Sequence, residues 1–262
     1  ENSPRPIGLF KGGERMSVIV EKVCPDSYGE RAGILAGDEL VKINDHEIFD
    51  VLDYRFYIQS RKLKLEILRN GETVVTNIRK SDEFADIGLE FKTYLMDKQH
   101  SCKNKCVFCF VDQMPKGMRE TLYFKDDDYR LSALMGNYIT LTNLNEDDID
   151  RIIRMHLPRI NISIHSANAD IRSKLLNHKD ADIMPYVKRF AEAGITMDCQ
   201  VVCCPGINDG EDLDNTITQE MWTRKDRCYE KSDFGEPCAC CDTCVCRLWK
   251  SRFRKDPRRG QR

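Results

Sequence analysis

The sequence predicts an α/β protein in two parts: a small β-rich domain, followed by an incomplete barrel of alternating strands and helices. Residues 16–80 hold short Val- and Ile-rich runs separated by turn residues, as expected of a small antiparallel sheet. From about residue 90 strands alternate with helices, an order that predicts parallel strands joined by right-handed crossovers. Only four such strands precede a change of composition at about residue 218, and four strand–helix units do not close a barrel.

The elements of the first domain follow from local patterns. An apolar strand is expected over Met16–Val23, a short helical segment around Tyr28–Ala32 and a second strand over Glu39–Ile43. Leu63–Leu68 alternates apolar and polar residues, which predicts a half-buried strand. Asn70-Gly71 directly after it is a strong signal for a tight β-hairpin.

The first domain contains the stretch AGILAGDELVKIND at Ala32–Asp45 and the hairpin Arg69-Asn70-Gly71, which together resemble the PDZ family. This resemblance implies a peptide or protein partner whose C-terminus adds to the sheet edge. Two segments, Ile7–Phe10 and Ile87–Phe91, are candidates for the loop that would hold the peptide carboxylate. The alternative, which we favour, is a domain that covers its neighbour and takes no peptide ligand.

The second domain is expected to hold two well-marked helices. Asn145 caps the first, which has an acidic first turn, and Pro158 ends it. Asp182–Ala193 forms the second, and Gly194 stands where a C-cap belongs. The four expected strands are Phe91–Met96, Tyr138–Thr142, Arg159–His165 and Ile195–Cys203.

Thirteen cysteines without a secretory signal pattern favour metal or redox chemistry over a disulfide framework. Cys102, Cys106 and Cys109 lie in one loop with Cys-x3-Cys-x2-Cys spacing, so that their thiolates can converge on one centre. Thiolates select zinc or an iron–sulfur cluster. A structural zinc site has four ligands, here with His100 as the fourth, whereas three thiolates suit a four-iron cluster with one open iron.

This cysteine motif, with Phe108 before its last cysteine, resembles the motif of the radical S-adenosylmethionine (radical SAM) superfamily. Four flanking segments narrow the resemblance to one uncharacterised family with a PDZ-like domain, a radical-SAM core and a C-terminal domain of unknown function. They are Asp97–Cys102, Met114–Arg130, Gly136–Asn143 and Cys204–Gly210, and the resemblance covers about residues 16–217.

The resemblance implies that the three cysteines hold three irons of a [4Fe–4S] cluster, while S-adenosylmethionine binds the fourth. A reductant such as flavodoxin or ferredoxin would then drive reductive cleavage to a 5′-deoxyadenosyl radical, which acts on an unknown substrate. Phe108 is expected near the adenine, and Thr142-Asn143 at the cofactor's amino group, although the usual acidic residue is absent. The alternative function is a non-catalytic binding or scaffold protein with a truncated, inactive cluster-binding core.

Strand alternation predicts a polar pocket at the same place. On the Arg159–His165 strand, Ser163 and His165 share a face opposite the isoleucines, and Gln200 lies opposite Cys199 on the next strand. Ligands of such folds bind at the carboxyl ends of the strands. Strand alternation thus gives Ser163, His165 and Gln200 as candidate cofactor-binding residues, in addition to Phe108, Thr142 and Asn143, which the resemblance implies.

Two further groups are interpreted as ordinary structure. Cys199, Cys203 and Cys204 are expected to pack as small buried apolar side chains. The acidic run Asp126–Asp128 is interpreted as a solvated turn, with substrate contact as its alternative.

The chain divides into an extension (1–15), the PDZ-like domain (16–90), the incomplete core (91–217) and a tail (218–262). The tail has 12 Lys and Arg against 7 Asp and Glu, whereas residues 1–217 have 29 against 36. Its Cys238–Cys246 run fits an auxiliary cluster or a zinc site. Because the tail lacks any helical or strand period, we interpret it as disordered or as the product of a shifted reading frame.

Charge and hydropathy also limit the partners and the location that are expected for the chain. The net charge of −2 gives no general electrostatic attraction to nucleic acid or to an anionic membrane surface. The longest apolar runs are far too short for a transmembrane helix. The expected location is the cytoplasm, with no membrane partner.

Overall fold

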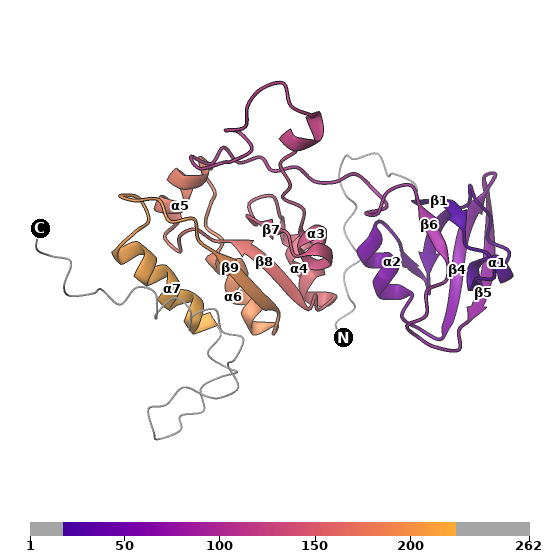
Figure 1. Ribbon diagram of the computed structural model, residues 1–262. Coiled ribbons are helices and arrows are strands. Elements are labelled where there is room, and N and C mark those ends of the chain that lie inside the picture. The colour runs from indigo at the N-terminus through magenta and orange to yellow at the C-terminus, as the bar shows by residue number, and fades with distance from the viewer. Residues whose placement is uncertain (1–17, 224–262) are drawn as a thin grey trace, which may run out of the picture.

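The computed structural model describes residues 18–223 (Figure 1). It contains a six-stranded antiparallel sheet in the first part of the chain and a three-stranded parallel sheet with helices in the second. This arrangement confirms the predicted α/β class, with a β-rich domain followed by a partial barrel. Within the described residues, no helix is long and apolar enough to cross a membrane.

The first sheet has the order β5-β4-β2-β1-β6, with β3 paired to β2. The two-residue turn between β4 and β5 places Asn70 at φ 53° and Gly71 at φ 86°, the left-handed region that this hairpin requires. The elements of this domain are β1 (Val18–Val23), α1 (Tyr28–Arg31), β2 (Glu39–Ile43), β3 (His46–Glu47), α2 (Val51–Tyr57), β4 (Lys62–Arg69), β5 (Glu72–Arg79) and β6 (Leu89–Phe91).

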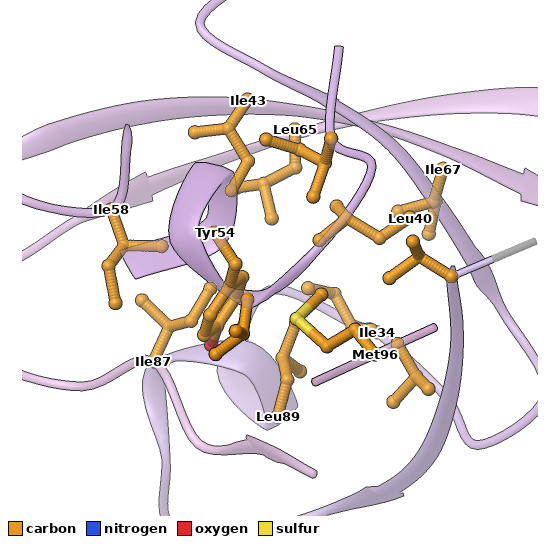
Figure 2. Packing of buried hydrophobic residues seen from close by; sticks show 14 of the residues in the cluster. Ile34, Leu40, Ile43, Tyr54, Ile58, Leu65, Ile67, Ile87, Leu89 and Met96 are labelled. Atoms are coloured by element: carbon orange, nitrogen blue, oxygen red, sulfur yellow. The ribbon is translucent and has the colours of Figure 1, made fainter. Parts of the chain in front are cut away.

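The segment after β6 belongs to the core of the first domain. The predicted strand over Phe91–Met96 is wrong, because only Phe91 is in a strand, and that strand pairs with β1. Leu95 and Met96 are buried in the first apolar core, and Figure 2 shows Met96 among the side chains from the sheet and α2. The Val51 N–H, at the start of α2, donates to the Leu95 carbonyl at 3.1 Å.

The second sheet has the order β7-β8-β9 with both pairs parallel, as predicted. Its strands end earlier than expected, because Leu141 (φ 60°) and His165 (φ 59°) adopt the left-handed conformation just beyond β7 and β8. The strands are β7 (Tyr138–Ile139), β8 (Arg159–Ser163) and β9 (Thr196–Gln200).

Helices pack against the parallel sheet, with α3 against β7 and β8 and α6 against β9. The predicted cap on α4 is confirmed, since Asn145 and Asp148 each accept a hydrogen bond from the other's backbone N–H. The predicted tail start at residue 218 falls inside α7, and residues 224–262, with the Cys238–Cys246 run, lie outside the described residues. The elements are η1 (Glu120–Tyr123), α3 (Tyr129–Met135), α4 (Glu146–Arg154), α5 (Ala169–Leu176), α6 (Met184–Glu192) and α7 (Glu211–Thr223).

A buried ion network joins the two domains where α2 faces α3 and α4 (Figure 1). Asp50, the N-cap of α2, accepts two hydrogen bonds from Arg151 of α4, at 2.6 and 2.8 Å. Arg130 of α3 contacts Asp50 at 3.3 Å and also pairs with Asp97 and Asp128. Burial would raise the pKa of the Asp50 carboxyl, but the hydrogen bonds and charge of Arg151, aided by Arg130, lower it below its usual value.

Candidate metal centre

The cysteine loop is attached to the second domain through its backbone. The Cys102 N–H donates to the Lys125 carbonyl at 2.8 Å. On either side of Cys106, the N–H groups of Lys105 and Val107 donate to the carbonyls of Leu176 (3.1 Å) and Leu175 (2.9 Å) at the end of α5. These bonds satisfy carbonyls that a helix leaves unpaired at its C-terminus, so α5 fixes the position of Cys106.

The three predicted metal ligands are brought into one neighbourhood. Cys102, Cys106 and Cys109 are all half-buried. Burial raises the pKa of the Cys106 thiol to about 11, and the charges of Cys102 and Cys109 add to the rise. Burial also raises the pKa of Cys102, and the charge of Asp127 raises it further. The thiolate forms would repel one another, and a bound cation would offset that repulsion.

A cluster makes weaker demands on ligand geometry than a single ion does. Within residues 18–223, no three His, Cys, Asp or Glu side chains are close enough together to share one metal ion. Each thiolate of a four-iron cluster instead binds a separate iron, so its ligands need only line the same pocket. The zinc alternative with His100 stays a prediction.

Asn104 pins the cysteine loop to the residues just beyond β7. Its side chain is 2% exposed, and its Nδ2 donates to Thr140 Oγ1 at 2.9 Å and to Thr142 Oγ1 at 2.8 Å. Asp127 accepts from the Thr140 N–H at 2.6 Å and from its hydroxyl at 2.7 Å. Thr142, which the sequence predicts to bind the cofactor, therefore belongs to a hydrogen-bond network that also contains Asn104 and Asp127.

The interpretation of Asp126–Asp128 as a solvated turn is wrong for two of its residues. Asp127 and Asp128 are buried, because Thr140 and Arg130 supply them with hydrogen-bond donors. The alternating polar residues at Thr140 and Thr142 were the available signal that polar partners gather here.

Asn143 offers an unpaired acceptor beside the cysteine loop. Its Nδ2 donates to the carbonyl of Ser101, the residue before the first ligand, at 3.1 Å. Its Oδ1 is buried and has no hydrogen-bond partner among the described residues. A buried acceptor left unpaired costs about 1–3 kcal/mol, so this oxygen fits a ligand that brings a donor such as an ammonium group. The unpaired oxygen and the grouped thiols together fit a cluster whose cofactor carries an amino group.

Two other predicted residues, Phe108 and His165, lie in direct contact. Their rings meet edge to face with centroids 4.7 Å apart. The Val202 N–H donates to His165 Nδ1 at 3.2 Å, which leaves the proton of the neutral ring on Nε2. Burial, followed by the charge of Arg172, lowers the pKa of His165 to about 4, so the imidazole is neutral at pH 7.

The remaining two predicted cofactor-binding residues, Ser163 and Gln200, differ in how exposed they are. Ser163 and Gln200 are paired across β8 and β9, at the carboxyl ends of both strands. Ser163 is buried, whereas the Gln200 side chain is exposed. The Gln200 carbonyl accepts from the N–H groups of Ile164 and His165 at 3.0 and 3.3 Å, so its backbone helps to fix the turn that carries His165.

Asn208 seats the glycine-containing loop at the same end of the sheet. It is fully buried, and its Nδ2 donates to the carbonyls of His165 (2.7 Å) and Val202 (3.0 Å). Its Oδ1 accepts from the Cys204 N–H at 2.7 Å. The expected burial of Cys203 is wrong: that side chain is exposed, because β9 ends at Gln200 and the chain turns away.

Arg172 of α5 is a further buried residue that sequence reasoning missed. It is 1% exposed, and its guanidinium donates to four carbonyls around the ends of β7 and β8. These acceptors are Thr140 (2.7 Å), Ser163 (3.0 Å), Ile164 (2.8 Å) and Ala181 (2.7 Å). Burial lowers the pKa of Arg172 to about 10, so the group stays charged at pH 7.

Comparison with known families agrees with this architecture. A family described as a Radical SAM-like domain matches residues 81–226, more than half of the chain. The chain therefore belongs to the radical SAM-like family. Residues 19–69, within the β-rich domain, match the model of a PDZ domain. No match was found among curated proteins.

Proposed function

We propose that this protein is a radical-SAM enzyme that binds a [4Fe–4S] cluster through Cys102, Cys106 and Cys109 and cleaves S-adenosylmethionine reductively. The observation that carries the proposal is the placement of three half-buried thiols on one loop, tied to the strand ends by Asn104 and α5. Family membership supports the same reading. The electron would come from a low-potential donor such as flavodoxin or ferredoxin.

The chain's own residues would bind and orient the cofactor. When bound and reduced, the cluster and S-adenosylmethionine supply a 5′-deoxyadenosyl radical for hydrogen abstraction from a substrate. Asn143 Oδ1 is a free acceptor for the ammonium group of the methionine moiety. Phe108 and the neutral His165 offer an aromatic surface and an Nε2–H donor to the adenine.

Anaerobic reconstitution tests this proposal. The wild-type chain should take up about four irons and four sulfides and release 5′-deoxyadenosine with dithionite and S-adenosylmethionine. Cys106→Ala should abolish nucleoside release. Cys203→Ala, which removes an exposed thiol outside the loop, is the matched control and should behave as wild type.

Two results would contradict the proposal. Uptake of zinc with no iron would overturn the cluster and support the zinc site. A complete cluster without nucleoside release would overturn the enzymatic reading in favour of the non-catalytic binding protein.

A further inference from the structure

We propose that two buried groups of opposite charge, Asp127 and Arg172, set the reduction potential of the cluster, with Arg172 raising it and Asp127 lowering it. This inference rests on the proposed function, because it concerns the cluster held by the cysteine loop. Both residues would act on the cluster through their electric field, and neither would be a catalytic residue.

Helix α5 carries Arg172 and also holds the loop around Cys106. The last two residues of this helix hold the loop on either side of Cys106, and Arg172 precedes them by three and four positions. At 1.5 Å per residue these separations are about 4.5 and 6 Å along the helix axis. Four carbonyls fix the guanidinium, and in the described part of the chain no carboxylate lies within ion-pair distance of it.

Asp127 and Arg172 both bind Thr140. The Asp127 carboxylate accepts from the N–H and hydroxyl of Thr140, whereas Arg172 donates to the Thr140 carbonyl. Asn104, which lies between Cys102 and Cys106 in the chain, donates to the same hydroxyl.

The sign of each effect follows from charge alone. One-electron reduction of the cluster by dithionite adds one negative charge and makes or breaks no bond. Arg172 stabilises that added charge, and Asp127 opposes it. Both groups are buried, where the low local dielectric makes such interactions much stronger than in water.

Potentiometric titration of the reconstituted protein, followed by electron paramagnetic resonance, tests the pair. Asp127→Asn keeps the shape and removes the charge, its one oxygen can still accept from the Thr140 N–H, and the midpoint potential should rise. Arg172→Met should lower it, while Arg172→Lys, which keeps the charge, should restore most of the loss. We expect each shift to correspond to at least a threefold change in the reduction equilibrium, or about 28 mV at 59 mV per tenfold. Asp38→Asn removes a buried charge of the first domain and should leave the potential unchanged.

The outcomes separate the two proposals. If Asp127→Asn and Arg172→Met both retain iron, sulfide and nucleoside release but neither shifts the potential, the inference about the two charges is overturned and the proposed function stands. If Arg172→Met loses the cluster because four carbonyls become unpaired, the Asp127→Asn shift alone decides. If the wild-type chain takes up no iron, both proposals fail.

Discussion

His165 shows how the surroundings of one residue set its chemistry. The left-handed backbone after β8 carries the imidazole into contact with Phe108, and the Val202 N–H occupies its Nδ1. The charge of Arg172 opposes protonation in addition to burial. The ring is therefore a neutral group with one available donor, which suits contact with a polar cofactor better than proton transfer near pH 7.

The lowered pKa of His165 predicts a pH-dependent contribution to stability. Its folded value of about 4 lies below the ordinary 6.5, so the unfolded chain binds the proton first as pH falls. Stability is therefore complete above about pH 6.5 and declines toward pH 4. Between pH 7 and pH 5 the wild type should lose about 2 kcal/mol more than His165→Gln, at 1.36 kcal/mol per pH unit. Urea unfolding at both pH values measures this difference.

The matched control is His46→Gln, which replaces an exposed histidine of the first domain and should keep the wild-type profile. If His165→Gln also kept that profile, the imidazole would be protonated in the folded state.

At this scale the sequence indicates the candidate ligands more readily than the residues that support them. The spacing of the three cysteines is a local property and is visible without a fold. Asn104, Asp127 and Arg172 come from separate segments and acquire their roles only when the chain brings them to Thr140. An arginine bonded only to backbone carbonyls has no partner side chain that a sequence pattern would reveal.

Among the elements, the turns show most directly what the chain tolerates. Gly71 has φ 86° in the β4–β5 hairpin, and nothing lies within 4 Å of where a Cβ would stand. Gly88 has φ 79° before β6, but a Cβ there would lie 2.3 Å from Ser27 Cβ. Ser27 is the N-cap of α1, and its Oγ accepts from the Glu30 N–H. Gly88 is thus required both by conformation and by the close approach of a capping residue.

The two glycines form a matched pair for mutation. Gly71→Ala should cost about 1 kcal/mol, because only the left-handed backbone opposes it. Gly88→Ala should cost about 1–3 kcal/mol more, since the overpacked Cβ must displace Ser27. Denaturant unfolding of the two variants measures the difference. Equal losses would mean that the α1 cap moves aside freely.

Elements defined by local signals are the ones that the sequence predicts well. The Asn70-Gly71 hairpin and the capped helix α4 depend on residues next to one another in the chain. β6 is different, because it pairs with β1 across most of the first domain. Its apolar residues read equally well as the opening strand of the second domain, and only the tertiary pairing decides between the two.

On the scale of the whole molecule, the junction between the domains is ionic at its centre and buried. Arg151 and Arg130 share Asp50, while Arg130 also binds Asp128 through two hydrogen bonds, at 2.7 and 2.9 Å. Removing Arg151 would leave the buried Asp50 carboxylate with one basic partner among the described residues, Arg130 at the longer distance of 3.3 Å, so most of its compensation for burial would be lost. The two domains should therefore unfold together.

Arg151→Met tests that coupling. It should destabilise the protein by about 3–5 kcal/mol, because Asp50 loses its bidentate partner in a buried site. We also expect the single unfolding transition to split into two, measured by calorimetry. Arg159→Met removes an exposed ion pair with Asp198 and should change stability by less than about 1 kcal/mol. One transition in both variants would show that apolar contacts alone join the domains.

The burial of Leu95 and Met96 in the first domain has a consequence for dissecting this protein into fragments. A cut after β6 would leave the PDZ fragment with a hole between its sheet and α2, and the other fragment with two apolar side chains in water. The next residue, Asp97, is bound by Arg130 of α3, so no cut there is neutral for both halves. The two domains are therefore best expressed and crystallised together, because the segment that leads to the cysteine loop packs into the first domain through Leu95 and Met96 and binds the second through Asp97.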